Sequence, residues 1–101
     1  HCVVVHPVKY AVATVGGARA GRRNFHQDGP STARPLITTG AGDHFNAAFC
    51  LGFMLGLGAD AALLMGVCCS GHYVFTGRAP KLKELTAFME NWRERMAGEN
   101  A

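Results

Sequence analysis

An almost wholly apolar stretch runs from Phe45 to Phe75 and is interrupted only once, by the sequence LGLGAD at 55–60. In its first half the apolar residues recur at helical intervals, and the opposite side is hardly more polar. A helix that is apolar on all sides is expected to be buried. The stretch therefore predicts two buried helices, one from Asp43 to LGLGAD and one from Ala61 to about Phe75.

The borders of these two helices carry recognisable signals. Asp60 is expected to cap the second helix, and Gly77 and Pro80 are expected to end it. Small residues fall four apart in the first helix, so they should line one face and let another backbone approach: Ala48, Gly52 and Gly56.

A third helix is predicted from Leu82 to about Met96, where the pattern is amphipathic. Its expected buried stripe consists of Leu82, Leu85, Phe88, Met89 and Trp92. The charged residues Lys83, Glu84, Glu90 and Arg93 are expected to face water.

The amino-terminal part favours strands. Val3–Val5 and Tyr10–Val15 are of strand type, and HPVK with Pro7 separates them, which predicts an antiparallel hairpin ending at Gly16 and Gly17. The polar, basic stretch 18–35 is interpreted as a connection with a short edge strand near Phe25. The expected fold class is α/β, with a β-hairpin or short strands followed by three helices, two of them buried.

Length and charge exclude several classes of protein. A chain of 101 residues forms at most one small domain, and its net charge of +3 calls for neither a nucleic acid nor a membrane partner. The first apolar run, Ala47–Ala59, is too short to cross a bilayer. The arginines at 19, 22, 23 and 34 are interpreted as solvated loop residues rather than phosphate ligands.

The four cysteines show neither a CxxC spacing nor the density of a secreted disulfide framework, so we expect reduced thiols and a cytoplasmic protein. His72 follows Cys68 and Cys69 at spacings of four and three. Adjacent cysteines point in different directions on a helix, so we predict no metal site from these residues.

The sequence TTGAGD, residues 38–43, places one acid behind three residues with almost no side chain, at the head of the first apolar helix. Backbone N–H groups there lack intrahelical partners and, together with the helix dipole, can bind an anion. Asp43 then has two possible roles. It can complement the helix terminus, or it can act as a general base that takes a proton from an attacking hydroxyl beside a bound phosphate.

The wider sequence supports a family resemblance. TTGAGDHFNAAFC resembles the second signature of the ribokinase-like (PfkB-type) carbohydrate kinases, in which such a turn opens a buried helix. CVVVHPVKYAVATVGG resembles the hairpin before that signature, LLMGVCCSGHYVFTGRAP the small-residue helix beneath the adenine, and KLKELTAFMENW the closing helix. The resemblance implies that residues 1–101 are a single partial domain, the carboxyl-terminal part of a ribokinase-like fold without its sugar-binding and lid portion. The start at His1, directly before an apolar run, agrees with this expectation.

The resemblance also implies residue roles. Asp43 matches the catalytic base, and the anion hole matches Gly40, Ala41 and Gly42. Thr38 and Thr39 match a strand end that leads into the turn. The residues expected at the nucleotide are Thr39, Val67, Cys68 and Gly71, although Cys68 can equally be a packed core thiol. His44 is expected to point to solvent or to a neighbouring lobe.

The activity implied by the resemblance is ATP-dependent phosphorylation of a sugar or sugar-like alcohol, with Mg²⁺ held mainly by residues outside this chain. These 101 residues alone should then be inactive, and the full-length protein could form a homodimer.

Two positions depart from the family pattern. Ile37 replaces an acid that helps hold a monovalent cation, which weakens the case for such a cation here, and Pro7 replaces a glycine of a phosphate-binding turn. These departures leave open a non-catalytic nucleotide-binding or regulatory module of the same fold. The sequence does not identify the sugar.

Overall fold

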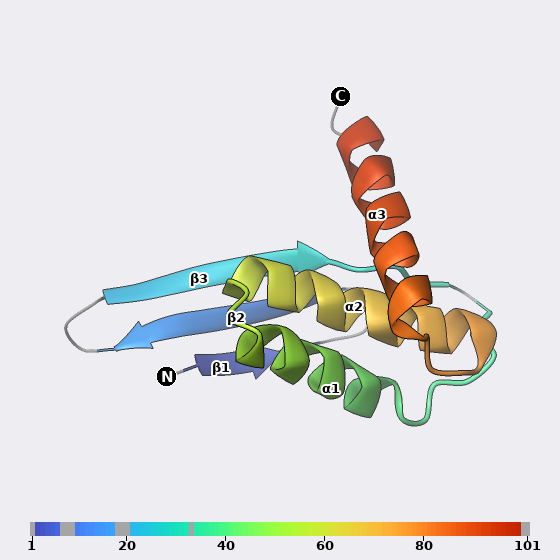
Figure 1. Cartoon of the computed structure of the whole chain (residues 1–101), viewed down its shortest axis with the longest axis horizontal. Coiled ribbons are helices and arrows are strands. Elements are labelled where there is room, and N and C mark those ends of the chain that lie inside the picture. The colour runs from blue at the N-terminus through green and yellow to red at the C-terminus, as the bar shows by residue number, and fades with distance from the viewer. Residues whose placement is uncertain (1, 7–9, 18–20, 33, 100–101) are drawn as a thin grey trace.

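The computed structural model describes residues 2–6, 10–17, 21–32 and 34–99, so the predicted break at Pro7 lies outside the described residues. Figure 1 shows a sheet at the amino-terminal end of the chain, two helices side by side over it, and a third helix that projects past the edge of the sheet. The elements are β1 (Cys2–Val5), β2 (Tyr10–Gly17), β3 (Gly21–Asp28), α1 (Ala41–Met54), α2 (Ala59–Thr76) and α3 (Leu82–Glu99). The predicted fold class, strands followed by three helices, is confirmed.

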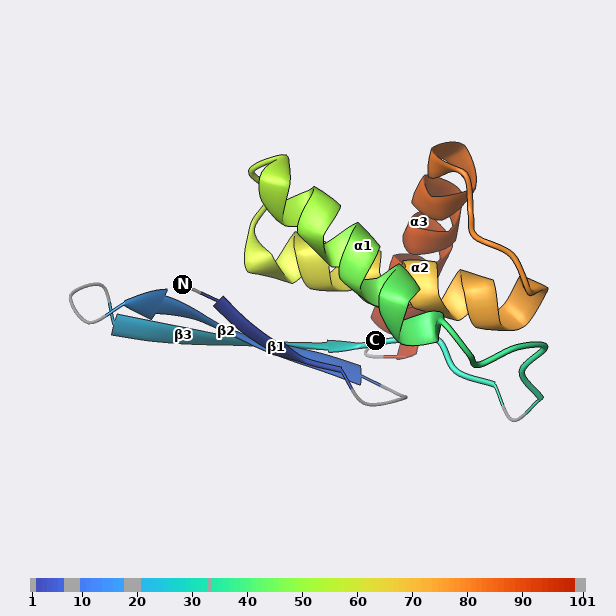
Figure 2. The same cartoon turned by 90° about the horizontal axis from the view of Figure 1, so that it is seen from below.

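The sheet is antiparallel, with the strand order β1-β2-β3. Ala13 pairs with Val4 on one side and with Phe25 on the other. Because successive side chains alternate between faces, Ala11 and Ala13 are buried while Val3 and Val5 are exposed. Figure 2 shows the three helices on one face of the sheet. The predicted hairpin of the first two strands is confirmed, including its end at Gly17.

β3 corrects the sequence-based expectation. The stretch interpreted as a connection with a short edge strand contains a strand of eight residues, paired with β2 along its whole length. Its side chains are mostly exposed, and only Phe25 and Gln27 are half-buried on the helix face. Arg22 and Arg23 therefore lie in an exposed strand rather than in a loop. Charged residues suit an edge strand because they discourage pairing with other chains.

α1 and α2 pack closely because glycines lie at their contact. A β-carbon on Gly52 would lie 3.0 Å from the Met65 sulfur and 3.2 Å from the Ala62 α-carbon. A β-carbon on Gly66 would lie 2.6 Å from the ring of Phe45, which is buried. The small-residue face predicted for α1 is confirmed at Gly52.

Some expectations for α1 and α2 are wrong. Gly56 lies after α1 with a φ of 80° and belongs to no helix face. α1 is buried along only one side, since Met54 is 85% exposed and the exposed Cys50 also lies away from the core. α2 begins at Ala59 with Gly58 as its cap, so Asp60 lies in the first turn and does not cap the helix.

The carboxyl end of α2 follows the prediction. Gly77 adopts a left-handed conformation with a φ of 77°, and its N–H donates to the Tyr73 carbonyl at 2.7 Å. This is the usual way in which glycine terminates a helix.

α3 packs against α2 and the end of β3. The Trp92 indole Nε1 donates to the Asp28 carbonyl at 3.0 Å, and the Gln27 amide contacts the Met96 sulfur at 3.4 Å. Leu85 is buried, as predicted, but Leu82 is 66% exposed and does not belong to the buried stripe. The helix also continues to Glu99, beyond the predicted end.

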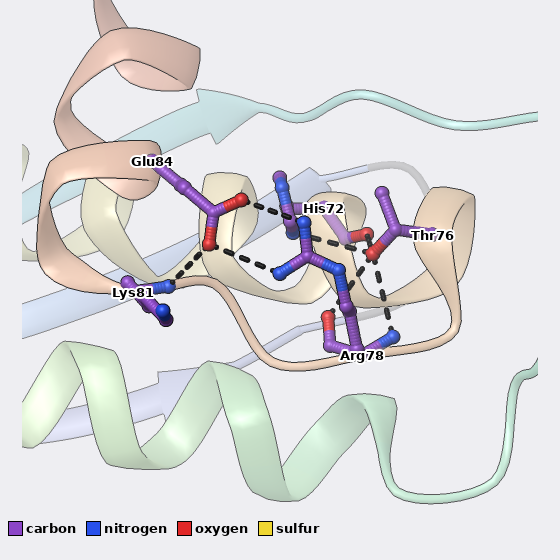
Figure 3. A network of polar contacts seen from close by, with 5 residues as sticks. All are labelled: His72, Thr76, Arg78, Lys81 and Glu84. Atoms are coloured by element: carbon purple, nitrogen blue, oxygen red, sulfur yellow. Dashed lines mark hydrogen bonds and ion pairs between the residues drawn. The ribbon is translucent and has the colours of Figure 1, made fainter.

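A polar network fixes the connection between α2 and α3 (Figure 3). The Arg78 guanidinium donates two hydrogen bonds to the Glu84 carboxylate at 3.0 and 2.7 Å, and the Lys81 N–H donates to the same carboxylate at 3.0 Å. The hydrogen bond from Arg78, and then that from the Lys81 amide, lower the pKa of Glu84 to about 2. The Thr76 hydroxyl donates to the His72 carbonyl at 2.7 Å, and the Arg78 carbonyl lies 3.1 Å from the same hydroxyl. Glu84, expected to face water, therefore forms part of the joint between the two helices.

The four cysteines are unpaired: Cys68 and Cys69 are buried, Cys2 is half-buried and Cys50 is exposed. Within the ranges described above, no helix combines the length and the apolar character needed to cross a membrane.

Candidate active site

The segment before α1 is anchored to α2. The Leu36 N–H donates to the Val74 carbonyl at 3.0 Å, so the chain lies along the end of α2 before it turns back. Thr38 and Thr39 were expected at a strand end, but Thr38 has no regular structure and Thr39 begins a turn. Nothing in the described part of the chain pairs with them as a strand, because the sheet consists of β1, β2 and β3.

The turn itself depends on Gly40. This residue is the cap of α1 and has a φ of 91°, a conformation that glycine adopts without the steric cost of a β-carbon. The Ala41 N–H donates to the Thr38 carbonyl at 3.1 Å, which closes the turn. α1 thus begins two residues earlier than predicted, and Gly42 and Asp43 lie in its first turn.

The amides at the start of α1 divide into two groups. The Ala41 amide is engaged with Thr38, and the His44 amide donates to the Gly40 carbonyl at 3.1 Å. The amides of Gly42 and Asp43 have no acceptor among the described residues. Of the three residues predicted to form the anion hole, Ala41 uses its amide inside the turn, whereas the amides of Gly40 and Gly42 have no acceptor among the described residues. Anion binding at this turn stays a prediction.

Asp43 is exposed, and its carboxylate forms no hydrogen bond or ion pair with the residues that the structure describes. α1 has no side-chain cap, so Asp43 does not serve as one. Among the described residues, a carboxylate and two amides without partners thus lie together at a helix N-terminus, where such groups can accept a proton and bind an anion.

Two aromatic side chains support the turn, His44 from α1 and Tyr73 from α2. The rings of His44 and Tyr73 stack with their centroids 3.9 Å apart and an angle of 17° between their planes. His44 Nδ1 lies 2.8 Å from the Gly40 carbonyl oxygen, and the Tyr73 hydroxyl donates to the Thr39 carbonyl at 2.6 Å. Of the two expectations for His44, the one that it points to solvent is thus wrong, and the one that it faces a neighbouring lobe stays a prediction. Tyr73 was not predicted as a site residue, because it contacts a turn that lies 34 positions earlier in the sequence.

His6, the residue directly after β1, supports the same helix end. Its ring stacks on Phe45 at 4.2 Å, and a β-carbon on Gly42 would lie 3.2 Å from the His6 ring. The absence of a side chain at Gly42 therefore allows this close packing. His6 lies in the sequence VHPVK, which gave no signal for this contact.

The predicted nucleotide residues are separated in the structure. Thr39 is exposed beside the turn, whereas Val67, Cys68 and Gly71 are buried in α2. A β-carbon on Gly71 would lie 2.8 Å from Pro30, and one on Gly29 would lie 2.7 Å from Val67. Glycine at these two positions therefore lets the segment after β3 pack closely against α2. Their contact with a nucleotide stays a prediction.

Burial disfavours the ionised form of the two buried thiols. Burial, with a smaller contribution from the neighbouring Cys69, raises the pKa of Cys68 to about 12. Burial also raises the pKa of Cys69. A thiol with so high a pKa does not ionise near neutral pH, which agrees with the reading of Cys68 as a core residue. The described residues contain no cluster of three His, Cys, Asp or Glu side chains that could hold a metal ion.

Comparison with known proteins identifies the family of this chain. A ketohexokinase from Haloferax volcanii is 43% identical to this chain over 63 residues, which cover 62% of the chain and 17% of that relative. The chain thus matches less than a fifth of the length of this curated relative. The model of the family described as prokaryotic ketohexokinase matches residues 1–92, which include the sheet, the turn and α1 to α3 as far as Trp92. The chain therefore belongs to the prokaryotic ketohexokinase family.

Proposed function

We propose that this chain is the carboxyl-terminal part of an ATP-dependent sugar kinase of the ribokinase-like (PfkB-type) group. It would supply the general base and part of the phosphate-binding surface. The observation that carries the proposal is the exposed carboxylate of Asp43 beside the amides of Gly42 and Asp43, which have no acceptor among the described residues, at the N-terminus of α1.

The proposed reaction uses these groups in one step. A sugar hydroxyl attacks the γ-phosphorus of ATP, the bond from that phosphorus to the ADP oxygen breaks, and the hydroxyl proton passes to Asp43. The transferring phosphoryl group carries its charge on peripheral oxygens, which donors at a helix N-terminus can stabilise. The Gly42 and Asp43 amides fit this task, because both are free among the described residues.

The acceptor we propose is a ketohexose, following the name of the relative and of the family. Magnesium would accompany ATP, held by the phosphates and by side chains outside this chain. The described residues offer no acidic cluster for the metal, so they fit ATP phosphates at the turn rather than a metal site.

The test is a turnover assay on the protein that carries this sequence, at its full natural length. With ATP, Mg²⁺ and a panel of ketohexoses, aldohexoses and pentoses, we expect ADP and one sugar phosphate in equal amounts. Nucleotide binding without sugar phosphate would instead favour the non-catalytic module, for which Ile37 and Pro7 are the sequence arguments. If the protein neither binds the nucleotide nor phosphorylates any sugar of the panel, both the kinase proposal and the non-catalytic module are contradicted.

The 101 residues by themselves should show little or no turnover, because the sugar-binding and lid portion of the family is expected outside them. The same assay on this chain alone checks this expectation. Turnover that matches the full-length protein would mean that these residues suffice, and the proposed division of labour would be wrong.

A further inference from the structure

The turn before α1 is held by two side chains from different helices. His44 lies in α1 and Tyr73 in α2, and their rings stack at 3.9 Å. Each side chain contacts one carbonyl oxygen of the turn. His44 Nδ1 lies 2.8 Å from that of Gly40, and the Tyr73 hydroxyl donates to that of Thr39 at 2.6 Å. We call this arrangement the His44–Tyr73 clamp.

The clamp fixes the orientation of consecutive peptide groups. Each peptide unit is planar, so a bound carbonyl oxygen fixes the direction of the N–H in the same unit. The Thr38 carbonyl accepts from the Ala41 amide, the Thr39 carbonyl from the Tyr73 hydroxyl, and the Gly40 carbonyl from both the His44 backbone amide and the His44 ring Nδ1. Three successive units are therefore held immediately before the Gly42 and Asp43 amides, which have no acceptor of their own among the described residues.

Both contacts have a defined chemistry. A carbonyl oxygen only accepts, so His44 Nδ1 must carry the proton, which it does in one neutral tautomer and in the imidazolium form. The Tyr73 hydroxyl also lies against Gly40, where a β-carbon would be 3.3 Å from its oxygen. The absence of a β-carbon at Gly40 thus leaves room for the Tyr73 hydroxyl beside the turn.

We infer that His44 and Tyr73 are positioning residues that hold the Gly42 and Asp43 amides, and with them the Asp43 carboxylate, in the geometry needed for phosphoryl transfer. This inference rests on the proposed function. A preorganised donor contributes mainly in the transition state, so loosening the clamp lowers kcat more than it changes the KM for ATP.

The kinetic test uses substitutions that remove one contact at a time from the full-length protein. Tyr73→Phe keeps the stacked ring and removes the donor to Thr39. His44→Val removes both the ring and its donor to Gly40. His44→Thr also removes the ring but supplies a hydroxyl, which can donate to the carbonyl four residues earlier, that of Gly40. We expect Tyr73→Phe and His44→Val each to lower kcat by about threefold to tenfold, the effect of one lost hydrogen bond, with little change in KM, and His44→Thr to recover part of the loss.

The sheet provides a matched control pair. Tyr10 and His26 also stack, at 5.2 Å, and Tyr10 is the only other tyrosine of the chain. Tyr10→Phe and His26→Val should leave kcat unchanged. Unchanged kcat in Tyr73→Phe and His44→Val, or equal losses in the control pair, would overturn the inference.

A second measurement needs no turnover. The Ala41 amide is protected by its bond to Thr38 inside the held turn, so Tyr73→Phe and His44→Val should speed its hydrogen exchange, measured by NMR on the nucleotide-free protein, by about threefold or more. An Ala41 amide that exchanges at the same rate in these variants and in wild type would show that the His44–Tyr73 clamp does not hold the turn. If the wild-type protein transfers no phosphate, the proposed function fails, and the exchange data alone decide whether the clamp holds the turn.

Discussion

Gly40 combines two constraints that are usually separate. Its φ of 91° disfavours any residue with a β-carbon, and a β-carbon here would lie 3.3 Å from the Tyr73 hydroxyl oxygen, which is closer than an ordinary contact. The residue therefore sets both the direction of the chain into α1 and the contact with α2. A sequence pattern can predict the first of these properties but not the second.

Replacing Gly40 by alanine should destabilise the protein by roughly 1–2 kcal/mol for the left-handed conformation, and should also lower kcat because the clamp is displaced. Gly56→Ala is the matched control, since Gly56 has a φ of 80° with open space around it. Denaturant unfolding and steady-state kinetics on both variants separate the effects. A kcat loss in Gly56→Ala as large as in Gly40→Ala would show that backbone strain alone explains the result.

Among the helices, the contact of α1 with α2 is the closest-packed feature that the sequence anticipated. Gly66→Ala would place a methyl group 2.6 Å from the buried ring of Phe45, and such overpacking costs about 1–3 kcal/mol. Gly98→Ala in α3 meets no atom within 4 Å and should stabilise the helix slightly, since alanine is the better helix former. Equilibrium unfolding in urea tests the opposite signs, and a stabilised Gly66→Ala variant would mean that α1 is not packed as described.

The sequence predicted elements whose signals are local. The two apolar helices, the break between them, the hairpin and the helix end at Gly77 all follow from periodicity and glycine placement, and the structure has them. β3 was underestimated because its exposed edge position requires few apolar residues, so its composition resembles that of a loop.

The candidate site was predicted less completely than the fold. Gly40 and Asp43 were identified because a glycine turn followed by an acid has a local pattern. Tyr73 and His6 were missed because their role depends on contacts across the fold, and the sequence gave no signal for either. The engaged Ala41 amide could not be predicted for the same reason, since a turn sequence does not reveal which of its amides already have acceptors.

For the molecule as a whole, the joint between α2 and α3 makes stability depend on pH. The pKa of Glu84 is lowered from 4.5 to about 2 in the folded protein, so its ionised form favours folding. This contribution is complete above about pH 4.5 and is lost as the pH falls toward 2. We expect the wild-type free energy of unfolding to fall through this range more steeply than that of Glu84→Gln.

The control for this prediction is Glu90→Gln, the same change elsewhere on α3. Unfolding in urea at several pH values, at low and high salt, provides the measurement, and high salt should reduce the difference because the ion pair is exposed. A Glu84→Gln variant with the same pH dependence as wild type would contradict the role given to this network.

The account as a whole depends on the chemistry of one carboxylate, and the kcat of Asp43→Asn in the full-length protein tests it most directly. Asp60→Asn is the control, because Asp60 is the acid in the first turn of α2. If Asp43 is the general base, its substitution lowers kcat by about 10²- to 10⁴-fold while ATP binding, measured by calorimetry, is retained, and Asp60→Asn keeps full turnover. An Asp43→Asn enzyme with wild-type kcat would contradict the account.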